Sequence, residues 1–452
     1  MAQLKSKTVY LCSSCGDDHP KWHGQCPSCS EWGTLSEYKV SKNRKNFKNE
    51  LAHESKTLND ILKSDDVERN PTGISEIDRV LGGGLLAGSL VLLGGNPGIG
   101  KSTMALQILP AFKKPVLYVS AEESEKQIGL RAKRLRVNSK MLHLSSENRI
   151  NVILEQITLI QPQLLVVDSI QTIFNEELDS LPGSASQIRE CGQKLLEVAK
   201  RTGITILIIG HVTKEGVIAG PKMLEHMVDT VLYLEGDDRH DHRILRSVKN
   251  RFGTINEVGI FQMDSHGLNE VMNPSELFLA ERRDDITGST IFPSLEGSRP
   301  ILVEVQVLAS NASFGTPQRN VNGFDFKRLA MLLAVLEKRL GIHMGTKDVF
   351  VNLVGGLKIN DPAADLAVIS AVASGVNEKL INGSIILIGE VGLGGEVRSV
   401  SQLESRIIES KSLGFKTIIA PGASVQRLKS THGGIKIISV STVTEAFQYL
   451  FK

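Results

Sequence analysis

The sequence predicts an α/β protein of at least two domains, preceded by a small metal-binding segment. Patterns of buried strands alternate with helical patterns along most of the chain, which is typical of a sheet covered by helices. The chain has 452 residues, whereas a single hydrophobic core stops growing at roughly 250 to 300 residues. Four of the five cysteines form two CxxC pairs near the N-terminus, in a segment too polar to build a core of its own.

The overall charge excludes a strong attraction of the whole chain to polyanions. There are 52 basic and 50 acidic residues, which leaves a formal charge of +2, so any nucleic-acid surface has to be local. No apolar region follows Lys5 and Lys7 as it does in a secretory signal. The longest apolar runs also fall short of the roughly 20 residues of a membrane-spanning helix. We therefore expect a cytoplasmic protein without a membrane partner.

The N-terminal cysteine pairs predict a zinc site. Two CxxC turns present four thiolates, which complete the tetrahedral shell that zinc prefers. Two disulfides are the alternative, but they rarely persist in the reducing compartment that a chain without an export signal occupies. His19 and His23 are competing ligands, although four cysteines already fill the shell. Because such a shell leaves no open position, we expect a structural metal. The predicted ligands are Cys12, Cys15, Cys26 and Cys29.

A phosphate-binding loop follows the first strong strand pattern, which covers residues 89–94. The loop has the form GxxxxGKS and leads into a helical pattern from Thr103 to Leu109, which is the context that a P-loop requires. Its glycines let backbone N–H groups turn toward phosphates. Lys101 is expected to reach the β and γ phosphates of ATP, and Ser102 to bind Mg²⁺. The predicted nucleotide-binding residues are Gly95, Asn96, Pro97, Gly98, Ile99, Gly100, Lys101, Ser102 and Thr103.

Three further strand ends are predicted to contribute to hydrolysis. Asp168 ends a buried run and is expected to hold the Mg²⁺ shell. Glu122 and Glu123 follow the strand at residues 115–120, where a carboxylate can activate the attacking water. We favour Glu122 as the general base, with Glu123 as the reserve. His211, after the strand at residues 204–210, is a candidate sensor of the γ phosphate or a structural histidine.

The residues leading into the P-loop resemble those of RecA/KaiC-like ATPases. They include Thr72-Gly73-Ile74 and the glycine-rich run at residues 81–85. The order of zinc knuckle, RecA-like P-loop core, pentapeptide Lys249-Asn250-Arg251-Phe252-Gly253 and C-terminal α/β Lon-protease-like domain is similar to the bacterial RadA (Sms) family. This resemblance covers nearly the whole chain. It implies a DNA-dependent ATPase that drives branch migration in recombination and repair, as a homo-hexamer supporting RecA and associated with the nucleoid.

The pentapeptide and a basic loop are the candidate points of action on DNA or on a neighbouring subunit. The pentapeptide lies near the far edge of the predicted sheet, and in ring-forming relatives this edge faces the neighbouring subunit. The resemblance therefore implies that Lys249 and Arg251 have a catalytic role at the γ phosphate of the nucleotide bound to that neighbour, or a contact with DNA. A solvated basic strand end is the plainer interpretation. Lys214 and Lys222 flank a glycine-rich loop that corresponds in place to the inner loop of such rings, where it would track single-stranded or branched DNA.

The C-terminal segment looks like a Lon protease without its catalytic groups. Ala363 stands where the nucleophilic serine is expected, and Glu404 where the lysine is expected. Alanine has no hydroxyl and glutamate cannot act as the activating amine, so we predict no peptidase activity. An ATP-dependent protease is thereby disfavoured. A KaiC-like regulatory ATPase that acts on protein partners without DNA remains the alternative function.

The same patterns predict the borders of the domains. The zinc finger is expected at residues 1–36, followed by a linker at 37–64. The RecA-like ATPase domain is expected at residues 65–275, a polar linker at 276–288 and the Lon-protease-like domain at 289–452. The predicted cofactors are ATP, Mg²⁺ and Zn²⁺.

Overall fold

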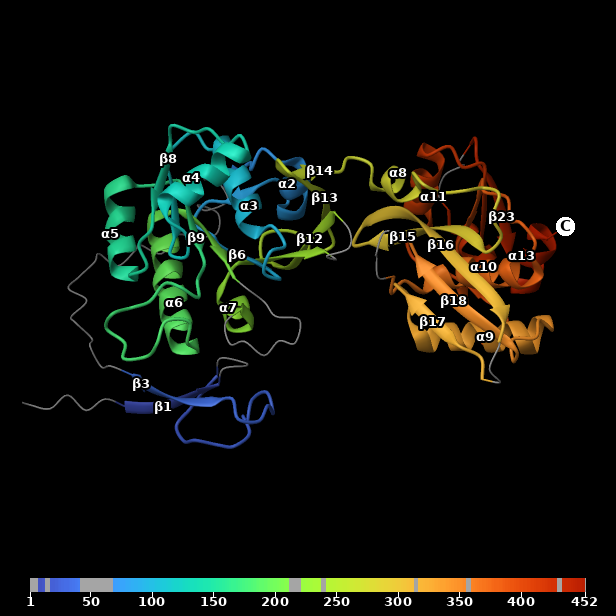
Figure 1. Cartoon of the computed structure of the whole chain (residues 1–452), viewed down its shortest axis with the longest axis horizontal. Coiled ribbons are helices and arrows are strands. Elements are labelled where there is room, and N and C mark those ends of the chain that lie inside the picture. Colours follow the sequence, from blue (N-terminus) through green and yellow to red (C-terminus); the bar gives the residue numbers. More distant parts are fainter. Residues whose placement is uncertain are drawn as a thin grey trace, which may run out of the picture. The chain divides into compact units, whose positions relative to one another are not determined.

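The structure, a computed structural model, describes residues 7–12, 17–40, 68–210, 221–236, 241–312, 316–354, 359–428 and 433–451. It divides into two compact units (Figure 1). The first comprises residues 1–236 and 241–270, and the second comprises residues 237–240 and 271–452. Among the described helices, none combines the length and the apolar character needed to cross a membrane.

A nine-stranded sheet forms the centre of the first unit, in the order β14-β13-β12-β11-β6-β10-β9-β7-β8. The strands from β11 to β8 in this order are parallel, and β12 to β14 extend the sheet with antiparallel pairs. The bounds are β6 Leu90–Gly95, β7 Val116–Ser120, β8 Leu142–Ser145, β9 Leu164–Asp168, β10 Thr205–Ile209, β11 Thr230–Gly236, β12 His242–Asn250, β13 Val258–Asp264 and β14 Gly267–Glu270.

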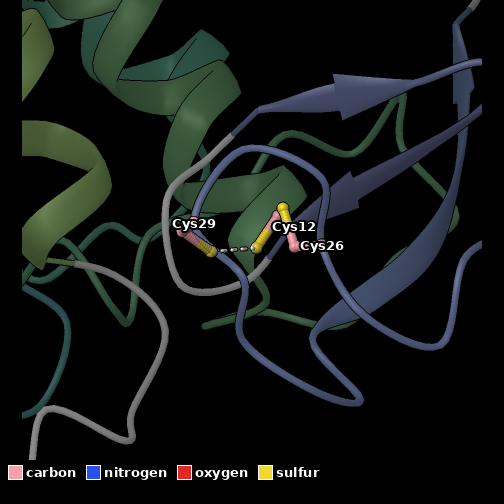
Figure 2. A group of neighbouring side chains, drawn as sticks. All are labelled: Cys12, Cys26 and Cys29. Atoms are coloured by element: carbon pink, nitrogen blue, oxygen red, sulfur yellow. Dashed lines mark hydrogen bonds between the residues drawn. The ribbon is translucent and has the colours of Figure 1, made fainter.

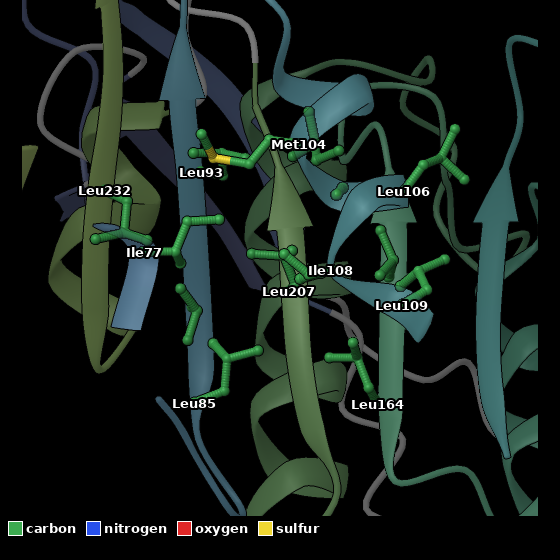
Figure 3. Packing of buried hydrophobic residues seen from close by; sticks show 14 of the residues in the cluster. Ile77, Leu85, Leu93, Met104, Leu106, Ile108, Leu109, Leu164, Leu207 and Leu232 are labelled. Atoms are coloured by element: carbon green, nitrogen blue, oxygen red, sulfur yellow. The ribbon is translucent and has the colours of Figure 1, made fainter. Parts of the chain in front are cut away.

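Helices cover both faces of this sheet, as expected for parallel strands whose side chains are buried on both sides. One core packs α2 and α3 on alternate residues of the strands (Figure 3). The other core packs α5 and α6 on the remaining residues. The helix bounds are α2 Ser75–Leu81, α3 Lys101–Gln107, α4 Glu125–Arg134, α5 Ile150–Ile160, α6 Ala185–Thr202 and α7 Pro221–Met227. Two short strands, β4 Arg69–Asn70 and β5 Leu85–Leu86, pair with each other, and a 3-10 turn η1 follows α3 at Leu109–Ala111.

The strand order brings the polar strand ends together at one edge. Strand β10 lies between β6 and β9, and Ile209 of β10 pairs with Leu93 of β6 and with Asp168 of β9. Asp168 in turn pairs with Ser120, the last residue of β7. Because parallel strands end at the same edge, the P-loop, Asp168 and the segment after Ser120 converge there.

The cysteine segment forms a separate three-stranded antiparallel sheet in the order β2-β1-β3. Its bounds are β1 Lys7–Cys12, β2 Asp18–His19 and β3 Leu35–Val40. Cys12, Cys26 and Leu35 form its small core, which is too small to hold such a segment without a metal or another cross-link.

The second unit is built on a seven-stranded sheet in the order β17-β18-β16-β15-β19-β22-β23. The strand bounds are β15 Ser289–Glu296, β16 Arg299–Asn311, β17 Arg319–Asn322, β18 Lys347–Leu353, β19 Ile385–Leu387, β20 Glu390–Val391, β21 Val397–Arg398, β22 Thr417–Pro421 and β23 Lys436–Val440. The helix bounds are α8 Pro274–Leu279, α9 Phe326–Leu340, η2 Pro362–Ala364, α10 Asp365–Asn377, α11 Leu403–Ser412, α12 Gly422–Val425 and α13 Val443–Leu450.

Helix α8 differs from the polar connection that the sequence suggested near residue 274. Asn273 caps the helix by accepting from the Glu276 N–H, and proline occupies its first turn. Phe278 is buried, and Ser275 Oγ donates to Glu409 and accepts from the Leu302 N–H. The segment is therefore part of the packed second unit, which begins at Val271.

Candidate functional site

The P-loop has the backbone conformation that its glycines allow. Gly95 has a φ of 150°, Gly98 of 77° and Gly100 of 115°, all in the region that side chains disfavour. A Cβ on Gly95 would lie 2.5 Å from the Leu234 carbonyl oxygen, and one on Gly100 would lie 2.5 Å from Met263 Cε. Glycine is therefore required at position 95 by the backbone of the neighbouring strand, whereas at position 100 the backbone conformation is the main reason, because the Met263 side chain can move.

Lys101 is buried at the first position of α3, inside the loop. Its Nζ donates to the carbonyl oxygens of Gly95 at 2.8 Å and Asn96 at 2.9 Å. Burial lowers the pKa of Lys101 to about 8, while the carboxylates of Asp168 and Glu122 act in the opposite direction. A cation and two carboxylates therefore lie close together at the P-loop. A metal-bound triphosphate requires both kinds of charge, the cation for its phosphates and the carboxylates for its metal and the attacking water.

The carboxylates of Asp168 and Glu122 are held by two hydrogen-bond donors that the sequence did not identify as site residues. Asp168 is buried, and its Oδ2 accepts a 2.6 Å hydrogen bond from the Tyr118 hydroxyl. Glu122 Oε1 accepts a 2.8 Å hydrogen bond from Ser169 Oγ. Each donor could have been found from a signal in the sequence. Tyr118 is the one polar aromatic residue in an apolar strand, and Ser169 directly follows Asp168.

The two adjacent glutamates have different surroundings. Glu123 forms an ion pair with Arg131 of α4, whereas Glu122 contacts Ser169 and lies close enough to Lys101 to influence its pKa. Glu122 is thus bound beside Asp168 and near Lys101, whereas Glu123 is paired with α4. This geometry favours Glu122 over Glu123 as the residue that faces the attacking water.

Lys249 and Arg251 lie at the opposite edge of the sheet from the P-loop of their own chain. Lys249 pairs with Val231 near the start of β11, whereas Gly95 pairs with Leu234 farther along β11. The separation of about three residues along a strand amounts to about 10 Å. The structure therefore does not bring the two cations to the nucleotide site of the same chain.

The side chains of three candidates are not described by the structure. His211 and Lys214 belong to residues 211–220, which the structure does not describe. Lys222 lies in α7, but the description does not extend to its side chain. Their roles stay predictions from the sequence.

Three of the four predicted zinc ligands meet in the N-terminal sheet (Figure 2). The sulfurs of Cys12, Cys26 and Cys29 lie within 4.8 Å of one another, with 3.7 Å between Cys12 and Cys29. Zn–S bonds of about 2.3 Å in a tetrahedron place sulfurs about 3.8 Å apart, so this spacing fits zinc. Cys15 lies outside the described residues, and His19 Nε2 lies 3.5 Å from Cys26 Sγ. The fourth ligand stays a prediction from the sequence, with Cys15 as the expected residue and His19 as the competitor that lies beside the three sulfurs.

The positions that correspond to the serine and lysine of Lon proteases hold Ala363 and Glu404. Ala363 is buried in η2, and Glu404 lies in the first turn of α11. An ion pair links the two segments, because the fully buried Arg406 donates to Asp361 at 2.6 Å. Asp361 also caps η2 by accepting from the Ala363 N–H.

Comparison with protein families agrees with this description. The family model for the AAA domain matches residues 56–217. The model for a rubredoxin metal binding domain matches residues 10–37, and the model for subunit ChlI of Mg-chelatase matches residues 309–424. Fold and site together define a RecA-like P-loop ATPase with an N-terminal zinc ribbon, and ATP, Mg²⁺ and Zn²⁺ are its cofactors.

Whole-chain relatives narrow this class to one family. The DNA repair protein RadA of Bacillus subtilis is 48% identical over 99% of this chain and 99% of its own length. RadA of Listeria monocytogenes is 45% identical, again over 99% of both chains. The chain therefore belongs to the RadA family of DNA repair proteins. A crystal structure of the RadB recombinase covers 45% of this chain and 99% of its own at 24% identity and a TM-score of 0.37, and this partial likeness adds nothing to the assignment.

Proposed function

We propose that the chain is a DNA-dependent ATPase that translocates on single-stranded DNA and drives branch migration during RecA-mediated recombination and repair. The observation that supports this most directly is the meeting of Lys101, Asp168 and Glu122 at one edge of the sheet. Membership of the RadA family supports the choice of DNA as the substrate. Action in the cytoplasm on nucleoid DNA, with RecA as a partner, belongs to the same proposal.

Each residue of the site has a defined task in this proposal. The loop from Gly95 to Thr103 wraps the phosphates, and Lys101 moves from the loop carbonyls to the β and γ phosphates. Ser102 and Asp168 hold the Mg²⁺ shell, which neutralises charge on the transferred phosphate. Glu122, oriented by Ser169, accepts the proton of the attacking water.

Lys249 and Arg251 act on the nucleotide of a neighbouring subunit in this proposal. Their distance from the P-loop of their own chain supports action in trans. A homo-hexameric ring supplies such a neighbour for every site, because every subunit of a closed head-to-tail ring has one. Cations that approach the γ phosphate from the next subunit stabilise its developing charge.

The second unit acts as a platform for assembly and has no peptidase activity in this proposal. Ala363 carries no hydroxyl for attack, and Asp361 and Arg406 form an ion pair beside it. Ala363→Ser is therefore expected to leave the chain inactive in an assay of ATP-dependent casein cleavage. The border at residue 64 remains part of the same proposal.

The rate of ATP hydrolysis with and without single-stranded DNA tests the function. We expect DNA to stimulate the rate, and Lys101→Ala to abolish it under both conditions while the chain stays folded. A rate that DNA leaves unchanged would favour a KaiC-like regulatory ATPase instead. A branched DNA substrate added to the same reactions reports whether hydrolysis moves strands.

A further inference from the structure

Both cations of the pentapeptide are bound by their own chain. Lys249 Nζ donates to the carbonyl oxygens of Glu225 at 2.6 Å and His226 at 3.2 Å, in the last turn of α7. Arg251 NH1 lies 3.6 Å from the Asp229 carboxylate, and the Arg251 N–H donates to the Asp229 carbonyl. Contacts of an ammonium with helix C-terminal carbonyls are favourable, because these carbonyls lack partners within the helix.

Asp229 anchors this arrangement to the strand that carries the P-loop. The residue is 1% exposed. Its Oδ2 accepts from the Leu90 N–H at 3.1 Å, at the start of β6, and from Lys200 Nζ at 2.7 Å. A buried carboxylate is stable only with such partners. The Asp229 side chain therefore joins the pentapeptide to the base of β6, and Lys249 joins the pentapeptide to the end of α7.

A contact with a phosphate would compete with these contacts. Two of the three N–H donors of the Lys249 ammonium are taken by the α7 carbonyls. Asp229 and a phosphate would compete in the same way for Arg251. The cations thus have two alternative positions, one in the chain and one in the neighbour's site.

The contacts within the chain are weak enough to be exchanged. The Arg251 side chain is 54% exposed and lies 3.6 Å from the buried Asp229 carboxylate, which is longer than a direct hydrogen bond. Burial and the nearby Arg251 lower the pKa of Lys249, so its charged form is poorly compensated where it lies. A triphosphate offers both cations a stronger partner.

We propose that Asp229 and the last turn of α7 form a holding site for Arg251 and Lys249. Asp229 is then a positioning residue, which restrains both cations until the nucleotide of a neighbouring subunit competes for them. This inference rests on the proposed action of the cations in trans.

Hydrogen–deuterium exchange of the full chain tests the holding site without nucleotide. Lys249→Met removes the donor to the α7 carbonyls, and we expect the amides of residues 221–227 to exchange about two- to fivefold faster. In the wild-type chain, a non-hydrolysable ATP analogue should also make the amides of residues 221–227 exchange faster. Unchanged exchange in the nucleotide-free variant overturns the holding site. The proposed function is tested separately by Lys101→Ala, which touches none of these residues.

Steady-state kinetics test the role of Asp229. Asp229→Asn keeps an oxygen for the Leu90 N–H but removes the charge that attracts Arg251. We expect kcat without DNA to rise about two- to fivefold with an unchanged KM for ATP, because the cations are released. Lys200→Gln is the matched control, since it leaves the Asp229 carboxylate to Arg251 alone, and its rate should not rise. A rate for Asp229→Asn at or below wild type in a folded chain, or an equal rise in both variants, overturns the proposal.

Discussion

Glu122 and Glu123 are neighbours in the chain, but only one of them is engaged with the nucleotide site. Glu123 is paired with Arg131, and Glu122 accepts from Ser169 beside Asp168. We expect Glu122→Gln to lower kcat by about 10² to 10⁴ because it removes the base, with ATP still bound. Glu123→Gln is the control and should stay within a few-fold of wild type. An equal loss in both variants, measured by phosphate release, would contradict this assignment.

Lys101 predicts a pH dependence of nucleotide binding. Its pKa is lowered to about 8, so the ammonium is charged below pH 8 and loses its proton as the pH rises through that value. We expect the affinity for a fluorescent ADP analogue to fall by up to about tenfold between pH 7 and pH 9. A constant affinity over this range would show that the charge of Lys101 does not govern binding.

The residues of the P-loop were predictable because their chemistry is local in the sequence. GxxxxGKS after a strand and before a helix leaves little freedom in the position of Lys101. The partners of Tyr118, Ser169 and Asp229 were not predictable in the same way. Tyr118 reaches Asp168 from another strand, 50 residues away, and such a contact exists only once the strand order is known.

At the scale of the elements, the P-loop depends on the strand beside it. Gly95 has no space for a Cβ because the Leu234 carbonyl of β11 approaches it, whereas a Cβ on Gly98 meets nothing within 4 Å. Gly95→Ala should destabilise the nucleotide-free chain by about 3 kcal/mol. Gly98→Ala should cost only about 1 to 2 kcal/mol for its backbone conformation. Chemical denaturation measures both, and similar losses would mean that β11 does not confine the loop.

The parallel strands were predictable from the sequence, but the antiparallel extension was not. The run at residues 164–168 appears in the structure with the predicted bounds, as β9, because a short apolar run between turn signals has few alternatives. Strands β12 to β14 contain many charged and polar residues, as in His242–Asn250. Their position follows from pairing with β11, so a pattern within one segment cannot reveal it.

At the scale of the whole molecule, action in trans predicts that two inactive chains complement each other. Lys101→Ala retains both cations of the pentapeptide but lacks a working P-loop, whereas Arg251→Ala has the opposite defect. If the chains mix at random in a ring, about a quarter of the sites combine an intact P-loop with an intact neighbour. We expect the mixture to hydrolyse ATP at about that fraction of the wild-type rate. Hydrolysis that stays at the level of the separate variants would argue that each chain works alone.

Strand β12 contacts the P-loop near one of its ends and helix α7 near the other. Near its first residue, Arg243 Nε donates to the Ile99 carbonyl in the P-loop at 3.3 Å, and near its last, Lys249 reaches the end of α7. A strand of nine residues extends about 30 Å and resists compression through its hydrogen bonds on both sides. In the proposed ring, this strand would therefore connect the nucleotide pocket of one subunit with the cations that the same subunit offers to the next.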